Sequence, residues 1–320
     1  MSIYLQARMH RVSMSIGMRC STKTLALAAL IVGQPAWAQE PSAPLACGDV
    51  VYGMAQLEQD LVCTTELGLT LKGQLDMNGF TLTCDGSIQG IVLVGRQSGL
   101  QNGQVVGCVR AVVLAGRGRH EVVRVDASGT QFGFLIKSRS NRLVGNTAIS
   151  VDNDAFRVTA PGNVLVYNTI VQAGDDGVDV RAPRTTLSRN VITGTAGEGI
   201  DVSAARNVIL GNTVIGAGDD AMQVRVGGNR IIGNTLSRST VGLLLQHEGA
   251  GATGNEVLGN VVLGNTGEGI LVSLTSEDNR IIGNEALGNG TDLLDRHPDC
   301  DDNLWAGNVF EIADPADCIQ

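Results

Sequence analysis

The stretch Asn-Val-Ile-Leu-Gly-Asn-Thr at residues 207–213 returns 22 residues later as Asn-Arg-Ile-Ile-Gly-Asn-Thr at residues 229–235. The second asparagine of this stretch belongs to a series, 22 residues apart for five members and then continued after small insertions: Asn146, Asn168, Asn190, Asn212, Asn234, Asn260 and Asn284. A unit of this length with short apolar triplets cannot bury its apolar face alone and must stack on its neighbours. The sequence therefore predicts an all-β fold, a parallel β-helix with about 22 residues per coil.

Three apolar columns follow the same repeat, and each predicts one face of the solenoid. The first column, with alternating spacing typical of a strand, contains Phe156, Val178, Ile200, Met222, Leu244, Ile270 and Leu294, with Val158, Val180, Val202 and Val224 two residues further on. The second contains Leu143, Leu165, Leu187, Ile209, Ile231, Val257 and Ile281, and the third Ile170, Ile192, Val214, Leu236 and Val262. Three short sheets wound into one prism are expected. The asparagines fall at a turn between two sheets, where Asn tolerates left-handed backbone and stacked amides form a structural ladder.

These coils, such as Gly-Glu-Gly-Ile-Asp-Val at residues 197–202, resemble the right-handed parallel β-helix repeat of the pectin-lyase-like superfamily. The segment Leu-Asp-Met-Asn-Gly-Phe-Thr-Leu at residues 75–82 is similar to an early segment of periplasmic NosD-like members, and the tail at 299–318 is similar to a cysteine-bearing cap of related exported proteins. The resemblance implies the fold over most of the chain. It leaves the function open, because the superfamily includes lyases, hydrolases, epimerases and non-catalytic proteins.

The N-terminus has the pattern of a Sec signal peptide. Basic residues precede an apolar run at 25–33, and Ala36-Trp37-Ala38 follows it. No segment is long and apolar enough to span a bilayer. We therefore expect a periplasmic or secreted protein with a leader at 1–38, an N-terminal cap and irregular coils at 39–96, the regular β-helix at 97–290 and a C-terminal cap at 291–320.

The charge of the processed chain limits its partners. Removing the leader takes four of the 23 basic residues and none of the 32 acidic ones, which leaves 19 against 32 and a net charge of −13. Such a charge disfavours nucleic acid and anionic membranes, and makes an anionic substrate difficult to hold unless a cation mediates. We expect a monomer.

Six cysteines remain after processing, an even number that implies disulfides in an exported chain. Six cysteines allow 15 pairings. Cys84 and Cys108 are about one coil apart, which places them on neighbouring turns within disulfide range. Each of the two remaining expected pairs closes one end of the solenoid: Cys47 with Cys63 at the N-terminal end, and Cys300 with Cys318 at the C-terminal end. A cysteine metal site is the alternative, but no CxxC or Cys/His cluster supports it.

An acidic column precedes the first apolar column: Asp154, Asp176, Glu198, Asp220, Glu268 and Asp292. Carboxylates on turns about 4.8 Å apart repel by roughly 1 kcal/mol per pair in water. A bound Ca²⁺, which takes several oxygen ligands, would offset that repulsion. The candidate ligands are Asp175, Asp176, Glu198, Asp219 and Asp220. The alternative is that each acid caps a turn through backbone amides.

The outward positions of the adjoining strand bring together a second group of polar residues. Asp179 and Asp201 are expected on neighbouring turns, flanked by Arg181 and Arg225, with His247 one turn beyond Arg225. Such a carboxylate pair could hold a metal, or act as acid and base on a glycosidic bond. Arg157, Ser203 and Gln223 are candidate ligand contacts on the same face. The alternative is a solvated, mutually neutralising Asp/Arg surface.

Known enzyme motifs are incomplete. Gly174-Asp175-Asp176 resembles the Gly-Asp-Asp of polygalacturonases, but the Gly-His-Gly and Arg-x-Lys elements of that family are absent. Trp305 is the one tryptophan of the processed chain, so binding would be polar rather than by ring stacking. The sequence favours recognition of an extended ligand, a polysaccharide, along the Asp/Arg face. A polysaccharide lyase or glycoside hydrolase using the same face and a non-catalytic NosD-like periplasmic accessory protein are the alternatives.

Overall fold

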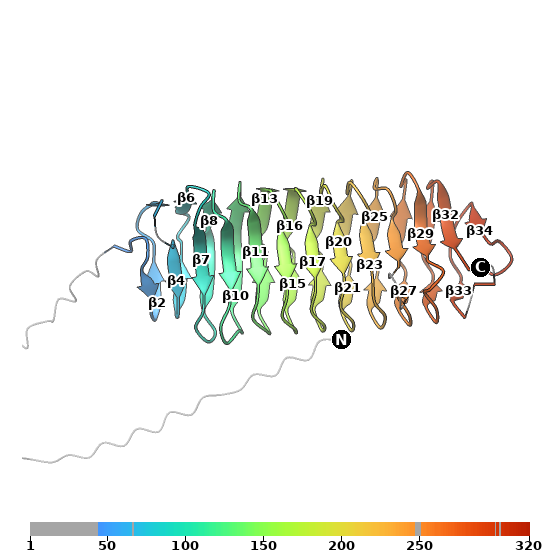
Figure 1. Cartoon of the computed structure of the whole chain (residues 1–320), viewed down its shortest axis with the longest axis horizontal. Coiled ribbons are helices and arrows are strands. Elements are labelled where there is room, and N and C mark those ends of the chain that lie inside the picture. Colours follow the sequence, from blue (N-terminus) through green and yellow to red (C-terminus); the bar gives the residue numbers. More distant parts are fainter. Residues whose placement is uncertain (1–43, 66, 247–250, 298, 301) are drawn as a thin grey trace, which may run out of the picture. The chain divides into compact units, whose positions relative to one another are not determined.

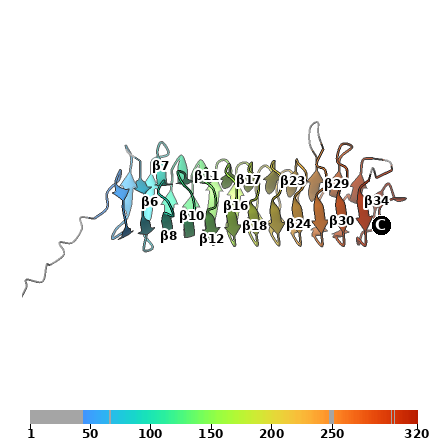
Figure 2. The ribbon, with the colours of Figure 1, turned by 90° about the horizontal axis from the view of Figure 1, so that it is seen from below.

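A computed structural model describes residues 44–65, 67–246, 251–297, 299–300 and 302–320. This part of the chain forms strands and turns without a helix, and every strand pairs in parallel. Figures 1 and 2 show the strands of successive turns stacked side by side. The predicted signal peptide lies outside the described residues. Within them, the structure has no helix that could cross a membrane.

Sheet 1 contains one strand from each turn, thirteen in all within the described residues. In order along the solenoid these are β1 (Val50–Val51), β4 (Leu69–Leu71), β7 (Gln89–Leu93), β9 (Arg110–Leu114), β11 (Phe132–Ile136), β14 (Phe156–Val158), β17 (Val178–Val180), β20 (Ile200–Val202), β23 (Met222–Val224), β26 (Leu243–Leu245), β29 (Glu268–Val272), β32 (Thr291–Asp295) and β34 (Ala313–Asp314).

Two further ladders form the other faces and share the long strands β8 (Gly99–Val106) and β10 (Glu121–Ser128), which bend from one face to the next. Sheet 2 adds β2 (Met54–Gln56), β5 (Gln74–Asp76), β12 (Arg142–Val144), β15 (Val164–Val166), β18 (Thr186–Ser188), β21 (Val208–Leu210), β24 (Arg230–Ile232), β27 (Glu256–Leu258), β30 (Arg280–Ile282) and β33 (Leu304–Ala306). Sheet 3 adds β3 (Leu61–Cys63), β6 (Thr81–Cys84), β13 (Thr147–Val151), β16 (Thr169–Ala173), β19 (Val191–Thr193), β22 (Thr213–Ile215), β25 (Thr235–Ser237), β28 (Val261–Leu263) and β31 (Glu285–Leu287). The predicted three-sheet solenoid is confirmed.

The predicted core column of sheet 1 is confirmed from Phe156 to Met222, where the side chains are no more than 1% exposed. It is wrong at two later turns, because Met222 pairs with Leu243 rather than Leu244, and Ile270 with Leu293 rather than Leu294. The turn into β26 has one residue fewer between the ladder asparagine and the strand, and so has the turn into β32. A shift of one residue moves every side chain of a strand to the opposite face.

The asparagine column forms the expected structural ladder. Asn190 donates from Nδ2 to Asn212 Oδ1 at 2.9 Å and to the Leu165 carbonyl at 3.0 Å, and the same Oδ1 accepts the Asn190 backbone N–H. The buried amides are therefore fully used along the axis. The left-handed backbone belongs to the preceding residue, such as Arg189 (φ 55°) or Gly211 (φ 63°), and not to the asparagine as predicted.

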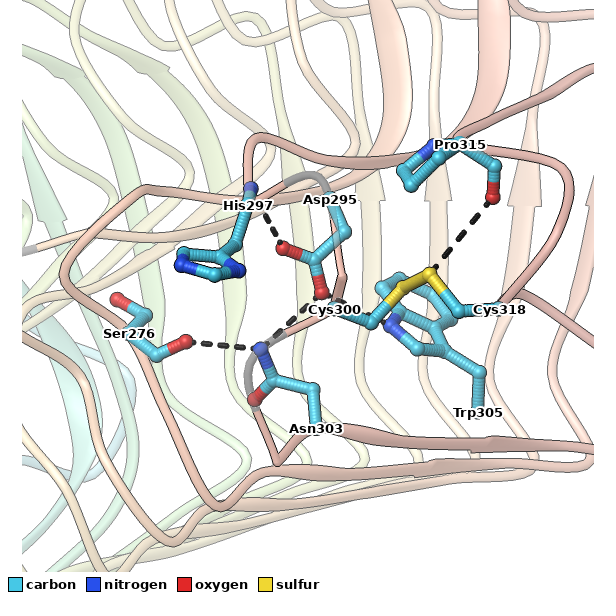
Figure 3. The surroundings of a disulfide bond; sticks show 8 residues. All are labelled: Ser276, Asp295, His297, Cys300, Asn303, Trp305, Pro315 and Cys318. Carbon is cyan, nitrogen blue, oxygen red and sulfur yellow. Dashed lines mark hydrogen bonds between the residues drawn. A yellow bond between two sulfur atoms is a disulfide. The ribbon is translucent and has the colours of Figure 1, made fainter.

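The three predicted disulfides are present: Cys47–Cys63, Cys84–Cys108 and Cys300–Cys318, with Cα–Cα distances of 5.6, 4.8 and 6.1 Å. Beside the last one, the buried Asp295 accepts hydrogen bonds from Asn303 Nδ2 at 3.1 Å and Trp305 Nε1 at 3.0 Å (Figure 3). Trp305 is therefore part of the C-terminal closure of the core. It is unavailable for stacking on a sugar.

Candidate functional site

The outward side chains of sheet 1 change character along the solenoid. Four consecutive turns present Arg157, Asp179, Asp201 and Gln223, which pair in this order through β14, β17, β20 and β23. We call these four residues the polar row. The turns on either side present apolar side chains at the same position: Val113 and Leu135 before it, Leu244 and Leu271 after it. The structure thus places Asp179 and Asp201 on neighbouring turns, as predicted.

The first half of the polar row is a cluster of carboxylates joined by guanidinium groups. Arg157 Nε contacts Asp179 Oδ2 at 3.1 Å and also forms a short ion pair with Asp154 Oδ2. Arg181 Nε donates to the same Asp179 Oδ2 at 2.6 Å. The Arg157 guanidinium lies 4.9 Å from the centre of the Phe132 ring, so its position is fixed from a third side.

The second half is built in the same way around Arg225. Its Nε donates to Asp201 Oδ1 at 2.9 Å and its Nη2 to Glu198 Oε1 at 3.0 Å. On the same turn as Arg225, Gln223 Nε2 lies 3.5 Å from Asp220 Oδ2. Because Arg157 and Arg225 each contact carboxylates of a neighbouring turn, the outward polar side chains are held in fixed positions rather than solvated independently.

Burial dominates the protonation of this face. It raises the pKa of Asp176 to about 9, with the neighbouring Glu198 carboxyl adding to the shift. Burial also raises the pKa of Asp220 to about 7, together with Asp219, and that of Asp179 to about 6 against the opposing effect of Arg181. The pKa values of Asp154 and Asp201 are raised for the same first reason. The face contains more buried carboxylate than its arginines stabilise, so it favours a proton or a bound cation.

Three carboxylates converge within the first half. Asp154, Asp176 and Asp179 place one oxygen each within 4.8 Å of one another. Asp154 and Asp179 are each 1% exposed, and the Oδ1 atom of each has no hydrogen-bond donor within the described chain. Gln223 Oε1 is a third buried acceptor of this kind. Buried acceptors are normally paired, so these atoms are suited to ligand hydroxyls or a hard cation with oxygen ligands.

The predicted metal ligands are only partly brought together. Asp176 belongs to the converging trio, and Asp175 is exposed beside it. Glu198 lies one turn later in the acidic column, and Asp220 with the exposed Asp219 two turns later. Asp154 was not among the predicted ligands, although it is the preceding member of that column. The 22-residue spacing from Asp176 could have identified Asp154, but the paired acids Asp175-Asp176 and Asp219-Asp220 drew the prediction to the later turns.

Other predicted residues are relocated by the corrected register. Asp292 does not belong to the acidic column, because Thr291 occupies that position when Leu293 faces inward. Its carboxylate instead caps the C-terminal turn by accepting from the backbone N–H groups of Asn289, Glu311 and Ile312.

The predicted contact residues that follow the strands of sheet 1 lie in different surroundings. Ser203 is exposed and donates to the Val180 carbonyl at 3.3 Å. Arg181 is more than half exposed beside Asp179. His247 lies outside the described residues, and Gln246 occupies the position one turn beyond Arg225.

Solved structures share the fold at low sequence identity. The A-module of the mannuronan C-5 epimerase AlgE6 from Azotobacter vinelandii superposes with a TM-score of 0.68, 17% identity, and coverage of 82% of this chain and 86% of that one. The A-module of AlgE4 from the same organism gives 0.63, 15%, 82% and 87%, and a variant of the periplasmic alginate epimerase AlgG gives 0.52, 12%, 82% and 78%. At these identities the likeness shows a shared parallel β-helix and nothing finer. No curated protein matches the sequence.

A family model described as periplasmic copper-binding protein (NosD) matches residues 133–312. Among the described residues, no group of three or more His, Cys, Asp or Glu side chains brings together the nitrogen and sulfur ligands that copper prefers. The six described cysteines are in disulfides, Met77 and Met222 are buried in the core, Met54 is exposed, and the buried His120 uses Nε2 on the Ala115 carbonyl. The carboxylate trio is a hard-ligand set. The family assignment therefore rests on the sequence match, which extends over more than half of the chain: this protein belongs to the NosD family of periplasmic proteins.

Proposed function

We propose that this protein recognises an extended carbohydrate, which lies along the outer face of sheet 1 and is held by the polar row. Membership of a periplasmic family and three disulfides favour an exported protein that meets polysaccharides. Two solved proteins with this fold are named for acting on mannuronan, which makes a polysaccharide a reasonable class of ligand by analogy of fold.

The observation that supports the proposal most directly is the set of unpaired acceptors. Asp154 Oδ1, Asp179 Oδ1 and Gln223 Oε1 are buried and lack donors among the described residues. A buried acceptor left unpaired costs about 1–3 kcal/mol, so the native state retains these atoms at a cost. Sugar hydroxyls are donors of suitable size. Asp154 and Asp179 lie on neighbouring turns about 4.8 Å apart, and Gln223 lies two turns beyond Asp179. Acceptors spread along the axis in this way fit a linear chain better than a compact ligand.

Calcium is the cofactor that this geometry can accommodate. Asp154, Asp176 and Asp179 converge, and Ca²⁺ accepts carboxylate, carbonyl and ligand oxygens in flexible geometry. A cation bound there would lower the net negative charge beneath the ligand. It would also give an anionic sugar a direct electrostatic partner.

Polysaccharide cleavage is a second candidate, supported by the spread of carboxyl pKa values. Asp176 is protonated at neutral pH, whereas the pKa of Asp179 is about 6, so an acid and a base lie in one cluster. Pairs of titratable groups with separated pKa values are the arrangement that acid–base catalysis requires.

One experiment tests recognition and separates it from catalysis. The processed protein is incubated with a panel of neutral and acidic polysaccharides, and binding is measured by affinity electrophoresis while reducing ends and ultraviolet absorbance are followed. Retention by a polysaccharide without new ends supports recognition. New reducing ends or unsaturated products support the enzyme, and both activities should be lost in Asp179→Asn. Absence of retention and of products across the panel would refute both.

A further inference from the structure

Charge is segregated across sheet 1. Six successive turns that leave its strands toward sheet 2 contain eight exposed basic residues. Arg181 pairs with Asp179, and the other seven are Arg96, Arg117, Arg119, Lys137, Arg139, Arg184 and Arg206. We call these seven the basic row. The six turns concerned, at 94–98, 115–120, 137–141, 159–163, 181–185 and 203–207, contain no Asp or Glu. The acidic column lies on the opposite edge of the same sheet, where the chain enters the strands. Over these six turns, one edge of a strongly acidic protein therefore has basic and no acidic side chains.

The basic row is not neutralised by the protein itself. None of its seven side chains forms an ion pair or side-chain hydrogen bond with a described residue, unlike Arg142 and Arg230, which pair with acids on sheet 2. The row follows six consecutive strands of sheet 1, from β7 to β20, a length of roughly 24 Å at the spacing of neighbouring strands. Like charges so arranged repel one another, so the arrangement is complementary to an extended anion.

Three members of the basic row share one backbone conformation. Arg119, Arg184 and Arg206 all have left-handed φ, at 61°, 59° and 62°. Gln97, Ser140, Gly162 and Gly228 occupy the same position in other turns, with φ of 60°, 58°, 74° and 71°. The position therefore accepts several residue types, and the fold does not require arginine there.

We infer that the basic row binds an extended anionic polysaccharide running parallel to the solenoid axis. This inference rests on the proposed function and specifies the class of ligand. Carboxylate or sulfate groups repeated along a glycan contact the guanidinium groups of successive turns. On the turns that both rows share, after β17 and β20, the sugar hydroxyls face Asp179 and Asp201 of the polar row. Nucleic acid is the less suitable polyanion, since these turns present no Trp, Tyr or Phe on which bases could stack.

The chain offers a matched pair of triple variants for the test. Arg119→Asn, Arg184→Asn and Arg206→Asn together remove three charges from the basic row, and Asn tolerates left-handed φ. The control is the triple variant with asparagine at Arg124, Arg189 and Arg238, which have φ of 51°, 55° and 58°. These residues lie at other corners of the solenoid, between sheets 2 and 3 or after sheet 3. Both variants change the net charge by the same amount in the same backbone conformation.

Binding of alginate, polygalacturonate, neutral dextran and duplex DNA is measured for the wild type and both variants at two salt concentrations. We expect the basic-row variant to bind the polyuronates at least tenfold more weakly and with less salt dependence, and the control to change less than twofold.

An equal loss in both variants would mean a net-charge effect and would overturn the inference. Binding of dextran as tight as that of polyuronate, unchanged in the basic-row variant, would overturn it and leave the proposed function intact. Failure to bind any glycan would overturn both. Tighter binding of DNA than of polyuronate, lost in the basic-row variant, would assign the row to nucleic acid instead.

Discussion

Arg225 donates from Nε to Asp201 Oδ1 at 2.9 Å although 24 residues of chain separate them. The contact exists because β20 and β23 are neighbouring strands of sheet 1, and Arg225 follows the second of them. The same guanidinium reaches Glu198 on the acidic edge. One side chain from the basic edge thus crosses toward two carboxylates, and it ties the two edges of sheet 1 together over the polar row.

Replacing Arg225 by Met should lower the free energy of unfolding by about 2 kcal/mol at pH 8, because two partly buried carboxylates lose their partner. Burial already raises the pKa of Asp201, and without the arginine it should rise further. Protonation then relieves the loss, so the destabilisation should be smaller at pH 5. Urea unfolding at both pH values measures this. The control Arg230→Met removes an exposed pair with Glu256 and should cost less than about 1 kcal/mol; equal effects would contradict the account.

Asp220→Asn should stabilise the protein at high pH. Burial raises the pKa of Asp220 in the native state to about 7 from an ordinary value of 3.8, so the native state binds the proton more tightly than the unfolded state does. The stability that this proton provides is complete below pH 4 and is lost as pH rises through 7. The variant should equal the wild type near pH 4 and exceed it by up to about 3 kcal/mol at pH 8. The exposed Asp317→Asn is the control. A wild-type gain in stability on raising the pH from 4 to 8, relative to Asp220→Asn, would refute the raised pKa of Asp220.

Calcium should stabilise the native state if the carboxylate trio binds it. Millimolar Ca²⁺ should raise the Tm relative to EDTA, because Ca²⁺ at one hundred times its Kd adds about 2.7 kcal/mol to the free energy of unfolding. Mg²⁺ should raise the Tm less. The double variant Asp154→Asn and Asp179→Asn should abolish the difference. Glu121→Gln with Asp317→Asn changes the charge equally at exposed positions outside the trio and should retain the difference. Identical melting curves of the wild type in Ca²⁺ and EDTA would leave the acids as structural groups.

Asn190→Ala should cost about 3 kcal/mol, because it removes two donated hydrogen bonds and leaves the donors of Asn168 unpaired in the core. Asn308→Ala, at the partly exposed end of the same ladder, should cost less. Thermal unfolding of both variants gives the comparison. A smaller loss for Asn190→Ala than for Asn308→Ala would be incompatible with a cooperative amide ladder.

Periodicity was sufficient to predict most of the fold. The spacing of Asn146 to Asn234 and the apolar columns placed the strands, because stacking on identical neighbours forces one register on every turn. The prediction failed at Leu244 and Leu294, where a turn is shorter by one residue and the next residue is also leucine. Hydrophobicity could not distinguish Leu243 from Leu244, since both are apolar and only the turn length decides which faces inward.

The candidate site was predicted in part. Alternation within a strand placed Asp179 and Asp201 outward and adjacent, as the structure has them. Convergence of Asp154 and Asp176 with Asp179 depends on side-chain direction at the edge of the sheet and on Arg157, which the spacing of residues in the sequence does not specify. The basic row was not predicted, because only the net charge of the chain was considered. That net charge is negative and hides a local group of basic residues.

The claim that the polar row is the ligand site can be tested in one binding comparison. Asp179→Asn with Asp201→Asn removes two outward carboxylates of sheet 1, and Glu121→Gln with Glu256→Gln removes two from the exposed surface of sheet 2 with the same change of charge. Affinity for the best polysaccharide of the panel is measured by calorimetry on folded protein. The account predicts a loss of at least tenfold for the first pair and less than twofold for the second. Wild-type affinity in the first pair, or an equal loss in both, would contradict it.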